Sequence, residues 1–347
     1  MPSSPAAPDP READEHPALI LANLGTPAEP RPRAVRSFLR EFLSDRRVVE
    51  MHPLLWRPVL EGIILRVRPR ASAAKYATVW RPGEETSRSG SPLMHYSERQ
   101  SELLQQELGE SVQVRVAMRY GQPALRRVMD ELMEAGCRRI ALLPLYPQYA
   151  ASSAGTVVDE AARFILASRN QPELRTVRSF ETAPAYIEAL ATALEQHWRV
   201  HGRPDPAAGE RLLLSFHSIP QAMHDAGDPY RAECERTVEL LSQRLNLPDG
   251  LAQLTFQSVF GPAAWIGPAT IDTVGELGRA GCPRLDVICP GFLSDCLETL
   301  EEINQLNRET FTTAGGGSFH YIPWGNDSDG AIATLAEQAR NVLAGWI

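Results

Sequence analysis

The stretch LLLSFHSIP, residues 212–220, indicates the fold class because a leucine-rich run ends abruptly in a turn. Three leucines and a phenylalanine predict a buried strand, and uninterrupted apolar strands are typical of parallel sheets covered by helices. The run ends in Ser215, His217 and Ser218 before Pro220 stops it. A single imidazole in such a place is more often structural than catalytic, so its meaning depends on what else converges there.

Similar apolar runs alternate with segments of helical period along the chain, which predicts βα units and an α/β fold. Eight strands are expected, at residues 18–24, 112–118, 139–145, 174–180, 211–216, 251–259, 284–289 and 319–323. Helices are expected at residues 33–43, 97–108, 122–135, 156–169, 184–199, 229–245, 268–280, 296–309 and 330–345. Four strands fall in each half, and 347 residues suffice for two domains, with a boundary expected near residues 180–186.

Composition excludes several classes of protein. The formal net charge of -8 argues against a nucleic-acid partner, which would need a basic face. Residues 1–16 are rich in proline and acidic groups and lack a signal-peptide core, so we expect a disordered tail on a cytoplasmic protein. No apolar run approaches the roughly 20 residues that a membrane-spanning helix needs. Five cysteines without a C-x-x-C pair predict buried, reduced thiols.

Polar residues gather where the predicted strands end, which is the edge where such sheets bind ligands. In SDCLETLEE, residues 294–302, a helix would place Asp295, Glu298 and Glu302 on one side. If Glu298 faces His217, the pair could hold a divalent metal or move protons near neutral pH. A solvated helical face and a structural histidine remain the alternatives.

Aromatic side chains near strand ends suggest a large flat pocket, although core packing explains some of them. They are Tyr120, Tyr146, Tyr149, Trp265 and Phe292, with Arg119 beside them. Residues 52–70, HPLLWRPVLEGIILRVRPR, fit a pocket lip or membrane-surface patch as well as a core helix flanked by arginines. The chain contains neither a G-x-x-x-x-G-K-[ST] phosphate loop nor a G-x-S-x-G elbow.

Taken in order, these segments resemble the ferrochelatase family. The resemblance covers nearly the whole chain and rests on LANLGTP, FLSDRRVV, GSPLMHYSERQ, AMRYGQP, LPLYPQYAASSAGT, LLLSFHSIP, FQSVFGPAAWIGPAT, CPGFLSDCLETLEEI and FHYIP. It implies two similar chelatase-like, Rossmann-like domains, each a four-stranded parallel sheet flanked by helices, with an active-site cleft between them. The domains are expected at 17–183 and 184–329, with a C-terminal helix, 330–347, packing back on the first.

The resemblance also implies roles for individual residues. By motif, His217 and Glu298 match the family's catalytic and metal-binding pair, with Asp295 and Glu302 behind them on a proton or metal path. The substrate-binding residues carried over are Arg119, Tyr120, Tyr146, Ser152 and Trp265. Cys296 and Val259 depart from residues common in relatives, which puts the route of metal entry in doubt more than the reaction itself.

The activity implied is insertion of Fe²⁺ into protoporphyrin IX to form protohaem. Alternatives are a coproporphyrin III ferrochelatase, another tetrapyrrole metal chelatase, and a porphyrin or haem carrier without turnover. Iron is expected as substrate, with no tightly bound cofactor and no iron–sulfur cluster. A monomer or weak homodimer is expected, and peripheral membrane contact through the lip is left open.

Overall fold

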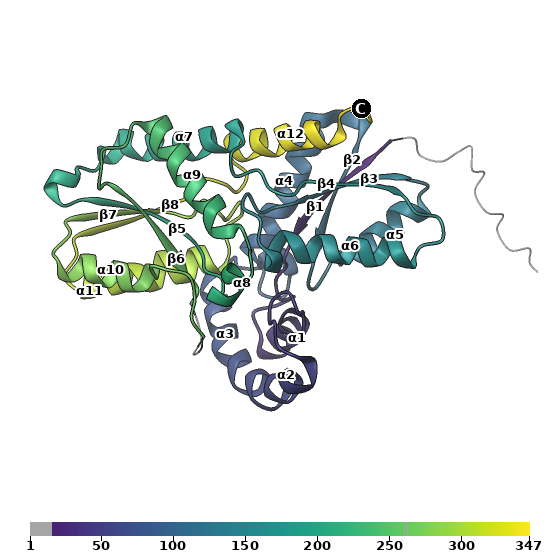
Figure 1. Ribbon diagram of the computed structural model, residues 1–347, viewed down its shortest axis with the longest axis horizontal. Coiled ribbons are helices and arrows are strands. Elements are labelled where there is room, and N and C mark those ends of the chain that lie inside the picture. The colour runs from purple at the N-terminus through teal and green to yellow at the C-terminus, as the bar shows by residue number, and fades with distance from the viewer. Residues whose placement is uncertain (1–15, 260, 262) are drawn as a thin grey trace, which may run out of the picture.

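The protein contains two four-stranded sheets whose strands are all parallel (Figure 1). The computed structural model describes residues 16–259, 261 and 263–347, so the tail predicted at 1–16 lies outside the described residues except for His16. In the first sheet the order is β2-β1-β3-β4, and in the second it is β6-β5-β7-β8. The predicted fold class, two similar parallel sheets flanked by helices, is confirmed.

The strands lie close to their predicted positions. They are β1 Ala18–Asn23, β2 Gln113–Met118, β3 Arg139–Pro144, β4 Glu173–Thr176, β5 Arg211–His217, β6 Ala252–Gln257, β7 Arg284–Ile288 and β8 Ser318–Ile322. Two predicted strands, 174–180 and 251–259, were too long. The edge strand β4 has no fully buried residue and ends at Thr176. Strand β6 ends at Gln257 because Ser258 has a left-handed backbone, φ 68°, which cannot continue a strand.

Helices flank both sheets. In the first half they are α1 Pro32–Leu43, α2 Pro53–Val59, α3 Leu65–Val79, α4 Pro92–Leu108, α5 Leu125–Glu134 and α6 Thr156–Ala167. In the second half they are α7 Pro184–His201, α8 Gln221–Asp225, α9 Tyr230–Leu245, α10 Thr270–Arg279, α11 Arg308–Thr313 and α12 Asp329–Leu343. The helix expected at 296–309 is instead a π-helix, η6 Glu298–Asn307, that runs into α11. Shorter π-helices are η1 Leu60–Ile64 and η4 Ala151–Gly155, and the 3-10 turns are η2 Arg88–Gly90, η3 Gly109–Ser111 and η5 Pro206–Ala208.

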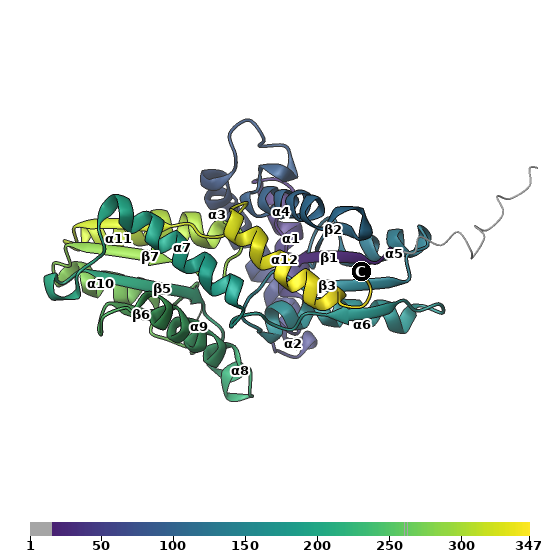
Figure 2. The ribbon, with the colours of Figure 1, turned by 90° about the horizontal axis from the view of Figure 1, so that it is seen from above.

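The two halves share one apolar core. Helix α12 lies along α7 and also against α4 and β3, so it joins the two sheets (Figure 2). Tyr186 packs edge-on against Trp324, with ring centroids 5.3 Å apart, inside a cluster that includes leucines of both sheets. Gln100 of α4 donates to the carbonyls of Leu293 and Asn326 at 3.0 and 2.8 Å. The predicted domain limits stay a prediction.

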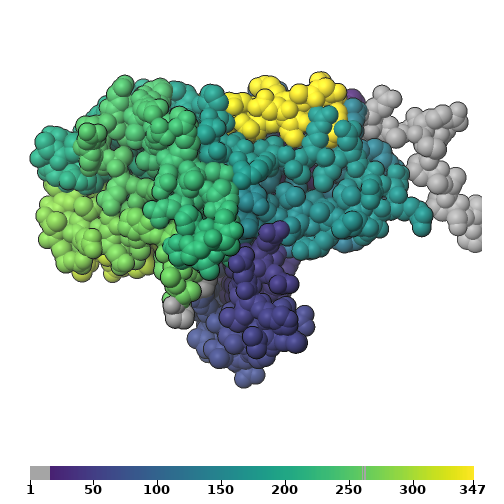
Figure 3. All heavy atoms as spheres, in the orientation of Figure 1, coloured from purple at the N-terminus to yellow at the C-terminus, as the bar shows by residue number. Residues whose placement is uncertain are grey.

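Helices α1, α2 and α3 form a lobe that projects from the junction of the two sheets (Figures 1 and 3). Residues 53–70 are helical here, and a pocket lip or membrane-surface patch stays a prediction. Leu60 and Leu65 are buried, whereas Leu54, Leu55, Ile63 and Val67 are exposed by 58–77%. Across the part of the chain that is described, no helix is long and apolar enough to cross a membrane.

Candidate active site

His217 is the last residue of β5, where the strand's carboxyl end meets the start of a turn. Its Nδ1 faces the carbonyl of Ser218 at hydrogen-bonding distance, and since a carbonyl only accepts, Nδ1 carries the proton. In the neutral ring the other nitrogen, Nε2, then has the free lone pair. His217 is half-buried, so its Nε2 is held in a fixed orientation and can accept a proton or ligate a metal.

Glu298 and Glu302 lie four residues apart on the π-helix η6, beside the end of β6. The side-chain amide of Gln257, the residue paired with His217 in the sheet, donates to the Glu298 carbonyl at 2.8 Å. The next residue, Ser258, donates its backbone N–H and its hydroxyl to Glu302, each at 2.6 Å. Strained left-handed residues and π-helices are both frequent at functional sites. Here they fix the carboxylate of Glu302 next to the strand that carries His217.

The charges of these three residues influence one another. Burial raises the pKa of Glu302, and the nearby Glu298 carboxylate raises it further, while Ser258 and His217 act in the opposite direction. Cys296, which departs from the residue common in relatives, is buried, and burial followed by the Glu298 carboxylate raises the pKa of its thiol well above normal.

Asp295 is directed to other partners. Its Oδ1 accepts hydrogen bonds from Thr299 and Tyr321, at 2.7 and 2.5 Å, and its Oδ2 accepts one from Asn326 at 2.7 Å. These bonds hold the turn that precedes η6. The expected alignment of three carboxylates is thus seen for Glu298 and Glu302, while both oxygens of Asp295 are taken up. Its place on a proton or metal path stays a prediction.

Arg119 and Tyr120 lie together after β2, and both contact a residue that sequence reasoning missed, Asp45. Arg119 Nη2 and the hydroxyls of Tyr120 and Thr156 converge on Asp45 Oδ2, at 2.5, 3.0 and 2.7 Å. Burial opposes ionisation of Asp45, but the hydrogen bonds from Thr156 and from the Arg47 backbone, together with the Arg119 charge, lower its pKa. The motif FLSD contained the signal, since an acidic residue ending an apolar helix was a candidate partner for arginine.

The turn LGTP, residues 24–27, brings the end of β1 against the turn that carries Arg119 and Tyr120. Gly25 has φ 116°, a conformation that side chains rarely adopt, and a Cβ on it would lie 1.9 Å from the carbonyl oxygen of Tyr120. Only glycine therefore lets the end of β1 approach the Arg119–Tyr120 turn. Arg119, Tyr120 and Asp45 line one end of an open hollow of about 800 Å³ at the base of the projecting lobe.

The charge of Glu298 in the second half acts on two buried tyrosines of the first half. The Tyr146 hydroxyl bonds the Asn23 side chain and accepts from the Leu24 N–H at 2.8 Å. Burial raises the pKa of Tyr146, and Cys296 and Glu298 raise it further. Tyr76 on α3 behaves in the same way, with burial first and then Glu298. Lys75 of α3 pairs with Glu301 of η6 at 2.9 Å, so α3 of the first half lies against the helix that carries Glu298 and Glu302.

The remaining two predicted residues lie on different halves. Ser152 is half-buried in η4, three residues after the end of the YPQY segment. Trp265 is half-buried and forms an isolated antiparallel bridge with Pro220, the residue that ends the turn after His217. The backbone thus ties Trp265 to the His217 turn, whereas Arg119 and Tyr120 belong to the opposite half.

Comparison with known proteins agrees with this arrangement. A family model described as Ferrochelatase matches residues 16–343. The chain belongs to the ferrochelatase family. Ferrochelatases of Dechloromonas aromatica and Aromatoleum aromaticum are similar to it, with 49% and 48% identity over 332 and 337 residues. These alignments cover 95% and 96% of this chain and 88% and 89% of the relatives. The predicted family assignment is confirmed.

Solved structures of much lower sequence identity support the fold alone. SirB from Bacillus subtilis with Fe³⁺ has a TM-score of 0.54 at 12% identity, covering 95% of this chain and 96% of SirB. The sirohydrochlorin chelatase SirB in complex with cobalt has a TM-score of 0.50 at 13% identity, covering 74% and 92%. The two-sheet architecture of this ferrochelatase family member is thus shared with proteins of very different sequence.

Proposed function

We propose that this protein inserts Fe²⁺ into protoporphyrin IX to form protohaem, in the space between its two halves. The observation that carries the proposal is the placement of His217, at the carboxyl end of β5, beside η6: its sheet partner Gln257 bonds the Glu298 carbonyl, and Ser258 bonds the Glu302 carboxylate. One imidazole and two carboxylates offer the nitrogen and oxygen ligands that suit a divalent first-row metal. The comparisons support this through the family to which the chain belongs.

Metallation of a porphyrin requires removal of two pyrrole protons and of the waters around the ion. Because His217 Nδ1 donates to Ser218, the neutral ring has its free lone pair on Nε2, and we propose that this nitrogen accepts a pyrrole proton. Glu298 and the raised-pKa Glu302 then pass protons or the metal onward. A porphyrin gripped and bent between aromatic walls would expose its nitrogen lone pairs, so binding energy would lower the barrier.

Arg119, Tyr120, Tyr146, Ser152 and Trp265 are proposed to bind the porphyrin. Arg119 pairs with Asp45. It can therefore also bind a propionate group of the porphyrin only if its five N–H donors are shared between that carboxylate and Asp45. Its Nε is already used by Thr156, at 2.8 Å to the hydroxyl and 3.0 Å to the carbonyl. We therefore propose that Arg119 acts mainly by positioning Tyr120 and the turn at the rim.

The alternatives differ in tetrapyrrole or in turnover. Metal insertion by the purified protein is followed spectroscopically with Fe²⁺, Zn²⁺ and Co²⁺, against protoporphyrin IX and coproporphyrin III. We expect Fe²⁺ and Zn²⁺ to enter protoporphyrin faster than coproporphyrin. Preference for coproporphyrin would favour a coproporphyrin III ferrochelatase, and tight porphyrin binding without any metallation would favour the carrier.

The projecting lobe suggests how an apolar porphyrin arrives. Leu54, Leu55, Ile63 and Val67 are exposed on α2, η1 and α3, and the exposed Arg57, Arg66 and Arg70 lie among them. We propose that this surface, here called the apolar lip, rests on an anionic membrane without spanning it.

A cytoplasmic location, a monomeric or weakly dimeric state, and the lack of an iron–sulfur cluster stay predictions, to be checked by fractionation, sedimentation velocity and iron analysis.

A further inference from the structure

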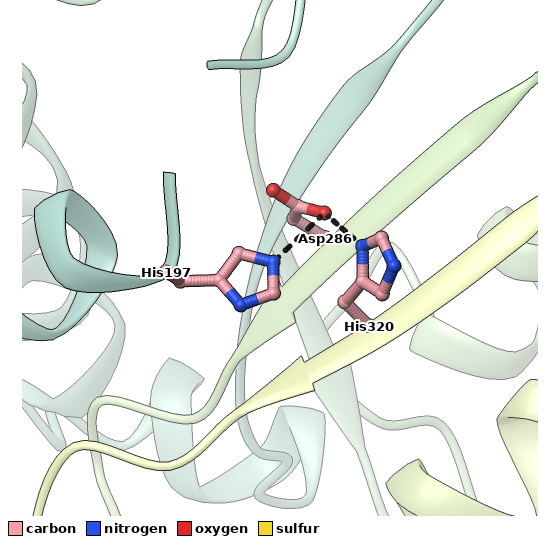
Figure 4. A group of neighbouring side chains, drawn as sticks. All are labelled: His197, Asp286 and His320. Carbon is pink, nitrogen blue, oxygen red and sulfur yellow. Dashed lines mark hydrogen bonds and ion pairs between the residues drawn. The ribbon is translucent and has the colours of Figure 1, made fainter. Parts of the chain in front are cut away.

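The second sheet also carries, outside the proposed active site, a group of side chains of the types that ligate metals. Asp286 of β7 and His320 of β8 are register partners in the parallel sheet, and His197 of α7 faces them (Figure 4). One ligand atom from each residue lies within 4.8 Å of the other two. His197 Nε2 is 3.8 Å and His320 Nδ1 is 2.9 Å from the same carboxylate oxygen, Asp286 Oδ1.

This group is separate from the proposed active site. Asp286 is in register with Leu212 on β5, whereas His217 ends that strand five residues later, roughly 16 Å away at about 3.3 Å per residue. Arg284, the first residue of β7, donates to the carbonyls of His201 and Gly202 that end α7. The group therefore lies toward the amino ends of the strands, under the last turns of α7.

His197 has an unused nitrogen. Its Nε2 is buried and makes no hydrogen bond to any residue that the structure describes, which is costly for a polar atom unless something else binds it. This nitrogen lies 3.8 Å from Asp286 Oδ1, so it faces the carboxylate at a distance too long for a hydrogen bond and close enough to share a metal ion with it.

Asp286 and His320 fit the same role. Asp286 accepts hydrogen bonds from Arg284 on both oxygens, at 2.9 and 2.7 Å, which fix the orientation of its carboxylate. Without a metal, His320 Nδ1 donates to Asp286 Oδ1 at 2.9 Å. Figure 4 shows that the second nitrogen of His320 points away from Asp286, so a metal that displaces the Nδ1 proton leaves the neutral ring protonated on that second nitrogen. A zinc ion about 2.1 Å from each ligand needs only small side-chain movements to close this triangle.

We propose that His197 Nε2, Asp286 Oδ1 and His320 Nδ1 form a binding site for a divalent transition metal such as Zn²⁺, outside the iron-insertion site. Two imidazoles and one carboxylate, with water completing the shell, are a common zinc ligand set. The bound ion links α7 to β7 and β8, and so stabilises the second half of the protein. This site is independent of the proposed iron insertion.

The test uses full-length protein carrying His217→Ala, which weakens metal binding at the proposed active site. Equilibrium dialysis with Zn²⁺ at neutral pH should show one bound ion that remains in this background. Adding His197→Gln or His320→Gln should weaken that binding at least about tenfold, whereas His201→Gln should change it by less than about threefold. His201 is the matched control because it stacks on His197, with ring centroids 4.4 Å apart, but is not one of the three ligands.

Thermal unfolding supplies the second readout. Zn²⁺ should raise the Tm of the His217→Ala protein and leave the Tm of its His197→Gln and His320→Gln derivatives unchanged, because only a ligand bound to the folded state stabilises it. The metal-free Tm of each variant reports whether it folds. Absence of a retained ion in the His217→Ala protein, a Zn²⁺ affinity left unchanged by His197→Gln and His320→Gln, or an equal loss of affinity in His201→Gln would overturn the assignment.

Discussion

Ser258 holds both carboxylate oxygens of Glu302, one through its backbone N–H and one through its hydroxyl, at 2.6 Å each. Because burial raises the pKa of Glu302, this group is still partly protonated where an ordinary glutamate is fully ionised. As pH rises through that pKa, Glu302 becomes a carboxylate that can accept protons released from the porphyrin. We therefore expect the ratio of Glu302→Gln to parent turnover to be near one at acid pH and to fall as pH rises.

The measurement is kcat for Zn²⁺ insertion across the pH range. Glu309→Gln, an exposed carboxylate in α11, is the matched control and should keep a flat ratio. A Glu302→Gln ratio that stays flat across the range would remove Glu302 from the proton path.

Asp45→Asn should destabilise the protein by about 3 kcal/mol, because it removes the charge partner of the largely buried Arg119 and one acceptor shared with Tyr120 and Thr156. The folded pKa of Asp45 is lowered, so its stabilisation is present above the unfolded pKa and is lost as pH falls through the folded pKa. The difference in unfolding free energy between parent and variant should therefore shrink toward acid pH.

Urea unfolding at a series of pH values checks this. The control is Asp159→Asn, whose pairing with Arg47 is more exposed and should be worth less than about 1 kcal/mol. Equal losses of unfolding free energy in both variants would show that the Asp45 network stabilises the fold no more than an exposed ion pair does.

Gly25→Ala should destabilise the fold by about 2–3 kcal/mol, since a Cβ there meets the Tyr120 carbonyl and the backbone is left-handed. Gly62→Ala is a suitable control because a Cβ at Gly62, within η1, has no atom within 4 Å and favours a helix. Thermal unfolding should show a clear drop in Tm for the first and none for the second. If Gly25→Ala unfolds at the parental Tm, the close approach is not a constraint.

Replacing both Leu54 and Leu55 by serine should reduce sedimentation with anionic vesicles several-fold while leaving the Tm unchanged, because both side chains are exposed on the apolar lip. Leu166→Ser on α6 is the control, since Leu166 is 83% exposed but lies outside the lip. Equal vesicle binding by all three proteins would contradict membrane contact through this surface.

The fold was predictable from the sequence because leucine- and valine-rich strands and helical periods alternate regularly. His217 and Glu298 could also be proposed, since both follow strand ends that meet at one edge of a sheet. The π-helical form of η6 was not predictable, because the i, i+4 spacing of Glu298 and Glu302 is the same in an α-helix. Asp45 and Ser258 were missed because their roles depend on contacts between segments 74 and 44 residues apart.

The central claim is that His217 takes part in metal insertion and does not merely support the fold. The direct measurement is a parallel one on the parent and His217→Ala proteins: the affinity for protoporphyrin IX by fluorescence quenching, and the anaerobic rate of Fe²⁺ insertion. We predict that the variant binds the porphyrin with similar affinity and loses insertion by about 10²–10⁴-fold. A variant that binds the porphyrin and inserts iron at the parental rate would contradict the account.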